Sequence, residues 1–100
     1  MGVLVVKNKA INMAYVRELE ATPSSNGIRI VLRDPSGRKV AEYMTKTSEN
    51  PCDVCREILK IAKNLFHSSR SVEITDIVRT AEERAKRCRC EVRVQAECTT

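Results

Sequence analysis

Apolar and polar residues alternate most regularly near the middle of the chain. Residues 27–34 alternate, with Arg29, Val31 and Arg33 facing away from an apolar set, and residues 40–45 alternate again, with Val40, Glu42 and Met44 against Ala41, Tyr43 and Thr45. The apolar set of the first segment is Ile28, Ile30 and Leu32. Between the two segments, residues 34–37 read Asp-Pro-Ser-Gly, which suits a type I turn. Because a period of two is typical of half-buried strands, we predict an antiparallel hairpin over residues 27–45.

A helical period replaces this alternation after Asn50. Apolar residues recur every three or four positions, and this stripe is Val54, Ile58, Ile61, Ala62 and Leu65. Asn50 can accept hydrogen bonds from the first free backbone N–H groups, and Pro51 suits the first helical position, where its missing N–H is not needed. Asp53 places a negative charge near the positive end of the helix dipole. We therefore predict a helix that begins at Pro51 and ends at the polar residues 67–70.

The N-terminal part of the chain contains a strand signal followed by a weaker helical one. Residues 2–6 are a short, largely β-branched run, which predicts a buried strand. In residues 11–19 the apolar positions recur near the helical period, so we expect a short helix with Asn12 as its cap. Residues 22–27 are rich in Ser, Pro and Gly and predict a loop.

The C-terminal part of the chain is less uniform. Residues 71–77 begin as a strand, with Val72 and Ile74 expected to face inward. Residues 75–87 fit either a helix capped by Thr75 or a long strand with a charged hairpin tip, and local propensity favours helix near the end of this segment. Residues 88–98 alternate between apolar and charged positions and predict a half-buried strand.

These elements predict an α+β protein. We expect a small mixed or mostly antiparallel sheet of four to five strands, packed by two to three helices. The 100 residues of the chain are expected to form a single domain, 1–100. A core of this size stabilises a fold only modestly, so a homodimer is an additional expectation.

Charge composition directs attention to polyanionic partners. The chain has 18 Lys and Arg against 13 Asp and Glu, which gives a net charge of +5, and it has only three aromatic residues. A surplus of positive charge attracts phosphate backbones without reading sequence, and scarce aromatics argue against stacking of bases on single strands. No apolar run approaches the ~20 residues that cross a bilayer. We therefore expect an intracellular, cytoplasmic protein without membrane contact.

Basic residues gather in three parts of the chain that we expect to form one surface. These parts follow the first strand, surround the turn of the central hairpin and precede the last strand. The candidate contacts are Lys7, Lys9, Arg38, Lys39, Arg84, Lys86 and Arg87. We predict sequence-tolerant binding of DNA or RNA through basic loops and a basic hairpin, without catalysis and without a cofactor.

Cysteine chemistry is the principal alternative. The five cysteines are Cys52, Cys55, Cys88, Cys90 and Cys98. They could be buried core thiols, disulfide partners or four zinc thiolates, and these readings stay open at the level of sequence. Cys52 and Cys55 stand at a helix start, where the dipole favours a thiolate, so they are a candidate disulfide or thiol pair. A cysteine-based redox or zinc-stabilised protein and a protein-interaction scaffold are therefore the alternative functions.

Catalytic motifs are absent from the sequence. His67, the only histidine, stands in a polar segment without a nearby nucleophile. The three glycines do not form a phosphate-binding loop. These observations favour a binding protein over an enzyme.

Two segments resemble the Alba family of archaeal chromatin and RNA-binding proteins. Residues 3–16 resemble the opening strand, basic loop and first helix of that family. Residues 72–77 and 91–94 resemble its two long final strands, which carry a basic hairpin arm. The resemblance implies that the nucleic-acid contacts are Lys7, Lys9, Arg38, Arg84, Lys86 and Arg87. The chain departs from the Alba pattern where residues 38–46 form an extra strand and where the first helix is short.

A second resemblance, to the ribonuclease H-like fold, accommodates the extra hairpin. The order of three strands, helix, strand, helix and strand resembles that fold, and Glu57 and Asp76 could match two of its metal-binding carboxylates. The first strand carries Lys7 where the family pattern needs an acid. Because two-metal catalysis needs a cluster of carboxylates, this resemblance implies an inactive relative.

Overall fold

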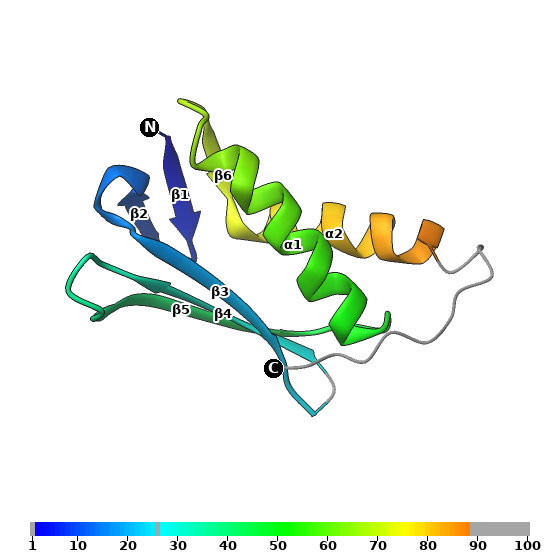
Figure 1. Cartoon of the computed structure of the whole chain (residues 1–100). Helices are drawn as coiled ribbons and strands as arrows, with labels where there is room; N and C mark the ends of the chain where they lie inside the picture. Colours follow the sequence, from blue (N-terminus) through cyan, green and yellow to red (C-terminus); the bar gives the residue numbers. More distant parts are fainter. Residues whose placement is uncertain (1, 26, 89–100) are drawn as a thin grey trace.

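A computed structural model describes residues 2–25 and 27–88 of the chain, and Figure 1 shows how its strands and helices are arranged. The elements are β1 (Val3–Val6), β2 (Lys9–Asn12), the 3-10 turn η1 (Met13–Tyr15), β3 (Glu18–Pro23), β4 (Gly27–Arg33), β5 (Lys39–Lys46), α1 (Pro51–Leu65), β6 (Ser71–Glu73) and α2 (Ile74–Cys88). Neither helix in this part of the chain is long and apolar enough to span a membrane.

The strands form two small sheets. In the first, which we call the N-terminal sheet, the order is β2-β1-β6, with β1 antiparallel to β2 and parallel to β6. In the second, which we call the meander, β3, β4 and β5 are antiparallel neighbours. The predicted α+β class is confirmed, with two helices as expected. The sheet differs from the prediction, because three strands pair in each of two sheets in place of four or five in one.

The central hairpin forms as its alternation predicts. Its turn closes with a hydrogen bond from the Gly37 backbone N to the Asp34 carbonyl O at 2.9 Å. The Asp34 carboxylate accepts hydrogen bonds from the Ser36 hydroxyl and from the backbone N–H groups of Ser36 and Arg38. These bonds, led by the one from the Ser36 hydroxyl, hold the pKa of Asp34 below its usual value. Gly37 has φ +89°, a conformation that costs other residues energy.

Helix α1 also begins where the sequence predicts. The Asn50 side chain accepts hydrogen bonds from the backbone N of Cys52 at 2.9 Å and of Asp53 at 3.3 Å. The stripe is buried at Val54, Ile58, Ala62 and Leu65 and half-buried at Ile61. Helix α1 covers the meander, and it packs along β3 and against α2 (Figure 1).

The predicted helix over residues 11–19 is wrong. Asn12 does act as a cap, since its side chain accepts a hydrogen bond from the Ala14 backbone N at 3.0 Å, but only the single turn η1 follows. Ile11 pairs with Leu4 in the N-terminal sheet, and Leu19 pairs with Leu32 in the meander. The helical spacing of these apolar residues therefore arises from two strands that bury them in different sheets.

The open choice over residues 75–87 is resolved in favour of a helix. Strand β6 is short, and α2 begins at Ile74, one residue before the predicted cap. The buried residues of α2 recur at helical spacing and are Ile74, Ile77, Val78, Ala81 and Ala85. The basic hairpin arm is therefore absent here, and Arg84, Lys86 and Arg87 lie on a helix. Beyond Cys88, which ends α2, the predicted strand over 88–98 lies outside the described residues.

One apolar core joins the two sheets to the two helices. Its largest fully buried side chains are Leu4, Met13, Ile28, Ile30, Leu32, Val54, Ile58 and Ile74. Helix α2 packs mainly on α1 and reaches β1 and β6. As a result, a groove between α1 and α2 opens beside β6.

Candidate nucleic-acid interface

The cations of the meander lie in a network with carboxylates on the outer face of that sheet. Glu42 accepts from both Arg29 and Lys39, the latter at 3.0 Å, and these bonds, led by the one from Arg29, lower the pKa of Glu42. Arg33 Nε donates to Glu20 Oε1 at 2.7 Å. Val31 lies between these ion pairs and is only 3% exposed, although it belongs to the outward-facing set. On this face the carboxylates therefore neutralise the cations that they contact, and Val31 is shielded from solvent.

The helices carry three more ion pairs, each between residues three positions apart. Arg56 pairs with Asp53, Lys60 with Glu57 and Arg79 with Asp76, at N–O distances of 3.4, 3.2 and 2.5 Å. Glu57 is buried, whereas its partner Lys60 is exposed. These cations thus face a carboxylate of their own helix.

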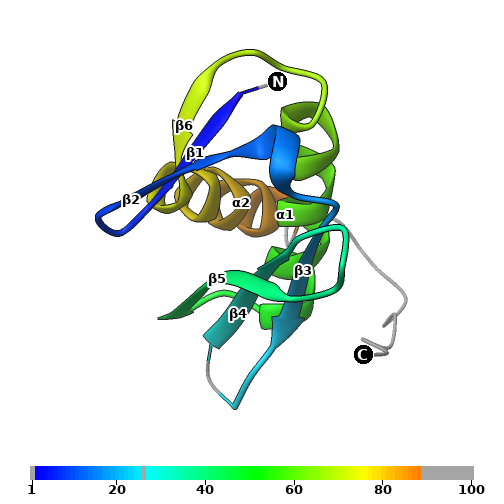
Figure 2. The same cartoon turned by 90° about the vertical axis from the view of Figure 1, so that its left-hand side faces the viewer.

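The three predicted basic groups lie in three different places. The turn between β4 and β5, with Arg38 and Lys39, is at the left end of the molecule in Figure 1, and the last turns of α2 are at the right end. The turn between β1 and β2, with Lys7 and its neighbour Lys9, lies on the opposite side from the β4–β5 turn in Figure 2. The expectation of one shared surface is therefore not met.

Near the end of α2 the structure brings Arg84 and Arg87 together, whereas Lys86 lies on another side of the helix, where it lines a separate hollow with Glu82 and Glu83. Arg87 follows Arg84 by three residues, which places it next to Arg84 along the helix surface. Within the described part of the chain, none of these three takes part in an ion pair. No carboxylate of the described residues therefore lies at ion-pair distance from them.

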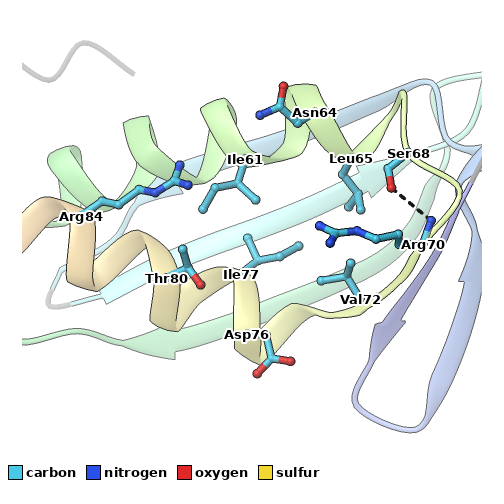
Figure 3. Close-up of a pocket in the computed structure, with 10 residues that line it drawn as sticks. All are labelled: Ile61, Asn64, Leu65, Ser68, Arg70, Val72, Asp76, Ile77, Thr80 and Arg84. Carbon is cyan, nitrogen blue, oxygen red and sulfur yellow. Dashed lines mark hydrogen bonds between the residues drawn. The ribbon is translucent and has the colours of Figure 1, made fainter.

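The groove between α1 and α2 adds a fourth cation, Arg70. The groove has a volume of about 410 Å³ and an apolar floor of Ile61, Leu65, Val72 and Ile77. Figure 3 shows the guanidinium groups of Arg84 and Arg70 at its two ends, both directed into it. The polar side chains along it are Asn64, Ser68, Asp76 and Thr80.

The backbone of Arg70 is held on two sides. Its N donates to Ser68 Oγ at 3.1 Å, and its carbonyl O accepts from the Val3 backbone N at 3.2 Å. Gly2 packs so closely that a Cβ at that position would lie 2.1 Å from the Arg70 carbonyl O. The start of β1 thus fixes where the Arg70 side chain leaves the backbone.

Sequence reasoning identified Arg84 and missed Arg70. Arg70 stands in a polar segment that marks the end of α1, and nothing local distinguishes it from a solvated residue. Its place in the groove follows from the parallel pairing of β6 with β1, which joins Val3 to Ser71. A search for basic residues directly before a predicted strand would have been the available signal.

The cysteines at the start of α1 are not bonded to each other. Cys55 is a free, buried thiol, and burial raises its pKa to about 11. Cys52 is disulfide-bonded, so it has no thiolate for the helix dipole to favour. The candidate Cys52–Cys55 disulfide is therefore not formed. Among residues 2–25 and 27–88, no group of three or more His, Cys, Asp and Glu side chains is placed to hold a metal ion.

The comparisons with protein families, with curated proteins and with solved structures give no match. The Alba and ribonuclease H-like resemblances therefore stay predictions from sequence.

Proposed function

We propose that this protein binds nucleic acid through its sugar-phosphate backbone. The contacts lie on a surface that we call the basic α2 surface, which consists of Arg70, Arg84 and Arg87. The observation that carries the proposal is that these three side chains have no ion-pair partner among the described residues and that two of them, Arg70 and Arg84, line the same groove. Other cations of the described chain are also outside any ion pair, but they do not line this groove; they are Lys7, Lys9, Arg17, Arg38, Lys46, Lys63 and Lys86.

Unpaired cations suit a phosphate backbone better than paired ones. A cation that contacts a phosphate releases condensed counterions, and this release drives binding. An arginine already hydrogen-bonded to a carboxylate would have to break that bond first. Guanidinium groups also match phosphate oxygens with two parallel hydrogen bonds. The net charge of +5 adds long-range attraction, so binding is sequence-tolerant and steeply dependent on salt.

The first test compares two double variants with equal changes in charge. Arg84→Glu/Arg87→Glu changes the basic α2 surface, and the control Lys9→Glu/Arg38→Glu changes the other two basic regions. We expect the first variant to weaken binding of duplex DNA and structured RNA more than tenfold at roughly 50 mM salt. Its log-log salt slope should fall by about 2, one for each lost phosphate contact. Fluorescence anisotropy across a salt series measures both quantities, and circular dichroism verifies that the variants are folded.

The control variant Lys9→Glu/Arg38→Glu tests whether nucleic acid contacts the basic α2 surface in preference to the other basic regions. If the control variant loses as much affinity as the first, binding is spread over the whole molecule. If the unmodified protein binds neither nucleic acid at that salt, the proposed function is wrong.

A further inference from the structure

We infer that the α1–α2 groove holds one nucleotide of a single strand, with one flanking phosphate on Arg70 and the other on Arg84. This inference rests on the proposed function and names the part of the nucleic acid that enters the groove.

Arg70 and Arg84 lie at opposite ends of the groove. They come from different elements, since Arg70 precedes β6 and Arg84 lies on the third turn of α2. Their guanidinium groups point toward one another from opposite ends of the groove, with Ile61 and Ile77 between them (Figure 3). The site therefore offers two separate anion contacts with an apolar stretch between them.

The two arginines with an apolar stretch between them match the two phosphates that flank one nucleotide of a strand. A nucleotide inside a strand has a phosphate on its 5′ side and another on its 3′ side, with the sugar and base between them. Bases of a single strand are free to turn outward, whereas those of a duplex are held in the stack. The volume of about 410 Å³ lies within the range of roughly 300–1,000 Å³ that is usual for ligand pockets.

Polar residues line the groove beside its apolar floor. Asn64 and Thr80 line the groove from α1 and α2, but the Asn64 amide and the Thr80 hydroxyl point away from the space between the two arginines in Figure 3. Asp76 is the acidic residue of the lining, and it is engaged by Arg79 at 2.5 Å. Its carboxylate points away from the space between the two arginines in Figure 3. The lining is therefore suited to an anionic ligand.

The experiment uses adenosine 3′,5′-bisphosphate as the probe, titrated into the full chain and followed by calorimetry or NMR. We expect it to bind at least about tenfold more tightly than adenosine 5′-monophosphate or adenosine 3′-monophosphate, because each charge-assisted contact contributes separately. Inorganic phosphate alone should bind more weakly than all three. A single-stranded oligonucleotide should displace the probe.

Two single variants assign the phosphates. Arg70→Ala should bind the bisphosphate no better than one of the monophosphates, and Arg84→Ala no better than the other. Lys86→Ala is the matched control, because Lys86 lies on α2 but does not line the groove, and it should keep the full preference for the bisphosphate.

The outcomes separate this inference from the proposed function. Equal affinity for the bisphosphate and the monophosphates, or a bisphosphate preference that survives both alanine variants, overturns the inference. The proposed function then stands or falls on the salt-dependent binding of DNA and RNA alone. If the bisphosphate binds through both arginines but oligonucleotides do not bind, two claims are overturned. These are the proposed function and the inference that the groove holds a nucleotide of a strand.

Discussion

The arginines of the meander differ from those of the groove in what surrounds them. Arg29 and Arg33 are bonded to carboxylates and help to cover Val31, so their role is structural. Arg70 and Arg84 border an open groove without such a partner among the described residues. Sequence alone shows the residue type but not the neighbour across the sheet. Lys39, for example, is predicted from sequence as a contact, and its ion pair with Glu42 becomes visible only in the fold.

Cys55 provides a test of the core at the scale of one residue. Its thiol is buried and has a pKa of about 11, so at pH 8 it is protonated and shielded. We expect iodoacetamide to leave Cys55 unmodified in the native protein at pH 8 and to alkylate it once denaturant unfolds the chain. Mass spectrometry with fragment ions locates the label. Rapid labelling of Cys55 in the native protein would contradict its burial.

The same shift gives a dependence of stability on pH. In the unfolded chain the pKa of the Cys55 thiol is near its ordinary value of 9.0, whereas burial raises it to about 11 in the folded protein. The folded state therefore binds more protons than the unfolded state in this window, and the free energy of unfolding contributed by Cys55 falls as the pH rises from about 9 to about 11. Cys55→Ala should remove this part of the decline.

At the scale of elements, local chemistry predicts the start of α1 and the central hairpin, and it fails where tertiary pairing competes. Asn50, Pro51 and the turn at Asp34 act through neighbours in sequence, so their roles are visible in the chain. Residues 11–19 have helical spacing, but Ile11 and Leu19 pair in strands on either side of the turn η1 and are buried there.

The cap of α1 is tested by Asn50→Ala. This change removes the acceptor of the Cys52 and Asp53 backbone N–H groups. We expect the free energy of unfolding to fall by about 1 kcal/mol, within the usual range of 0.5–2 kcal/mol for a lost N-cap. Ser48→Ala, an exposed change shortly before the helix, is the control and should be close to neutral. Urea denaturation measures both, and equal losses would show that the cap contributes nothing of its own.

At the scale of the whole molecule, the α+β class could be predicted, whereas the two sheets and the groove could not. The class follows from alternating and helical patterns in separate segments. The groove depends on the pairing of Val3 with Ser71, which no local pattern encodes. The split into two sheets depends on the short turn η1, which interrupts the chain between β2 and β3.

Because α1 packs on the core with one face, truncating neighbouring residues of this helix to alanine should destabilise the protein by different amounts. Ile58 is fully buried, whereas Leu59 is 45% exposed. We expect Ile58→Ala to lower the free energy of unfolding by about 2–5 kcal/mol, because it leaves a cavity in the core. Leu59→Ala should lower it by less than about 1 kcal/mol, since exposed positions tolerate truncation. Chemical denaturation of both variants measures the difference. Similar losses in the free energy of unfolding would mean that α1 turns a different face toward the core.

The parallel pairing of β1 with β6 has a consequence for the order of folding. The strands of the meander are near neighbours in sequence, but residue 3 must find residue 71 across almost the whole described chain. Contacts between distant residues carry a larger entropic cost and tend to form late. We therefore expect the meander and α1 to assemble first and β6 to dock last. Since Arg70 precedes β6 directly, a chain emerging from the ribosome would complete the α1–α2 groove only at the final step of folding.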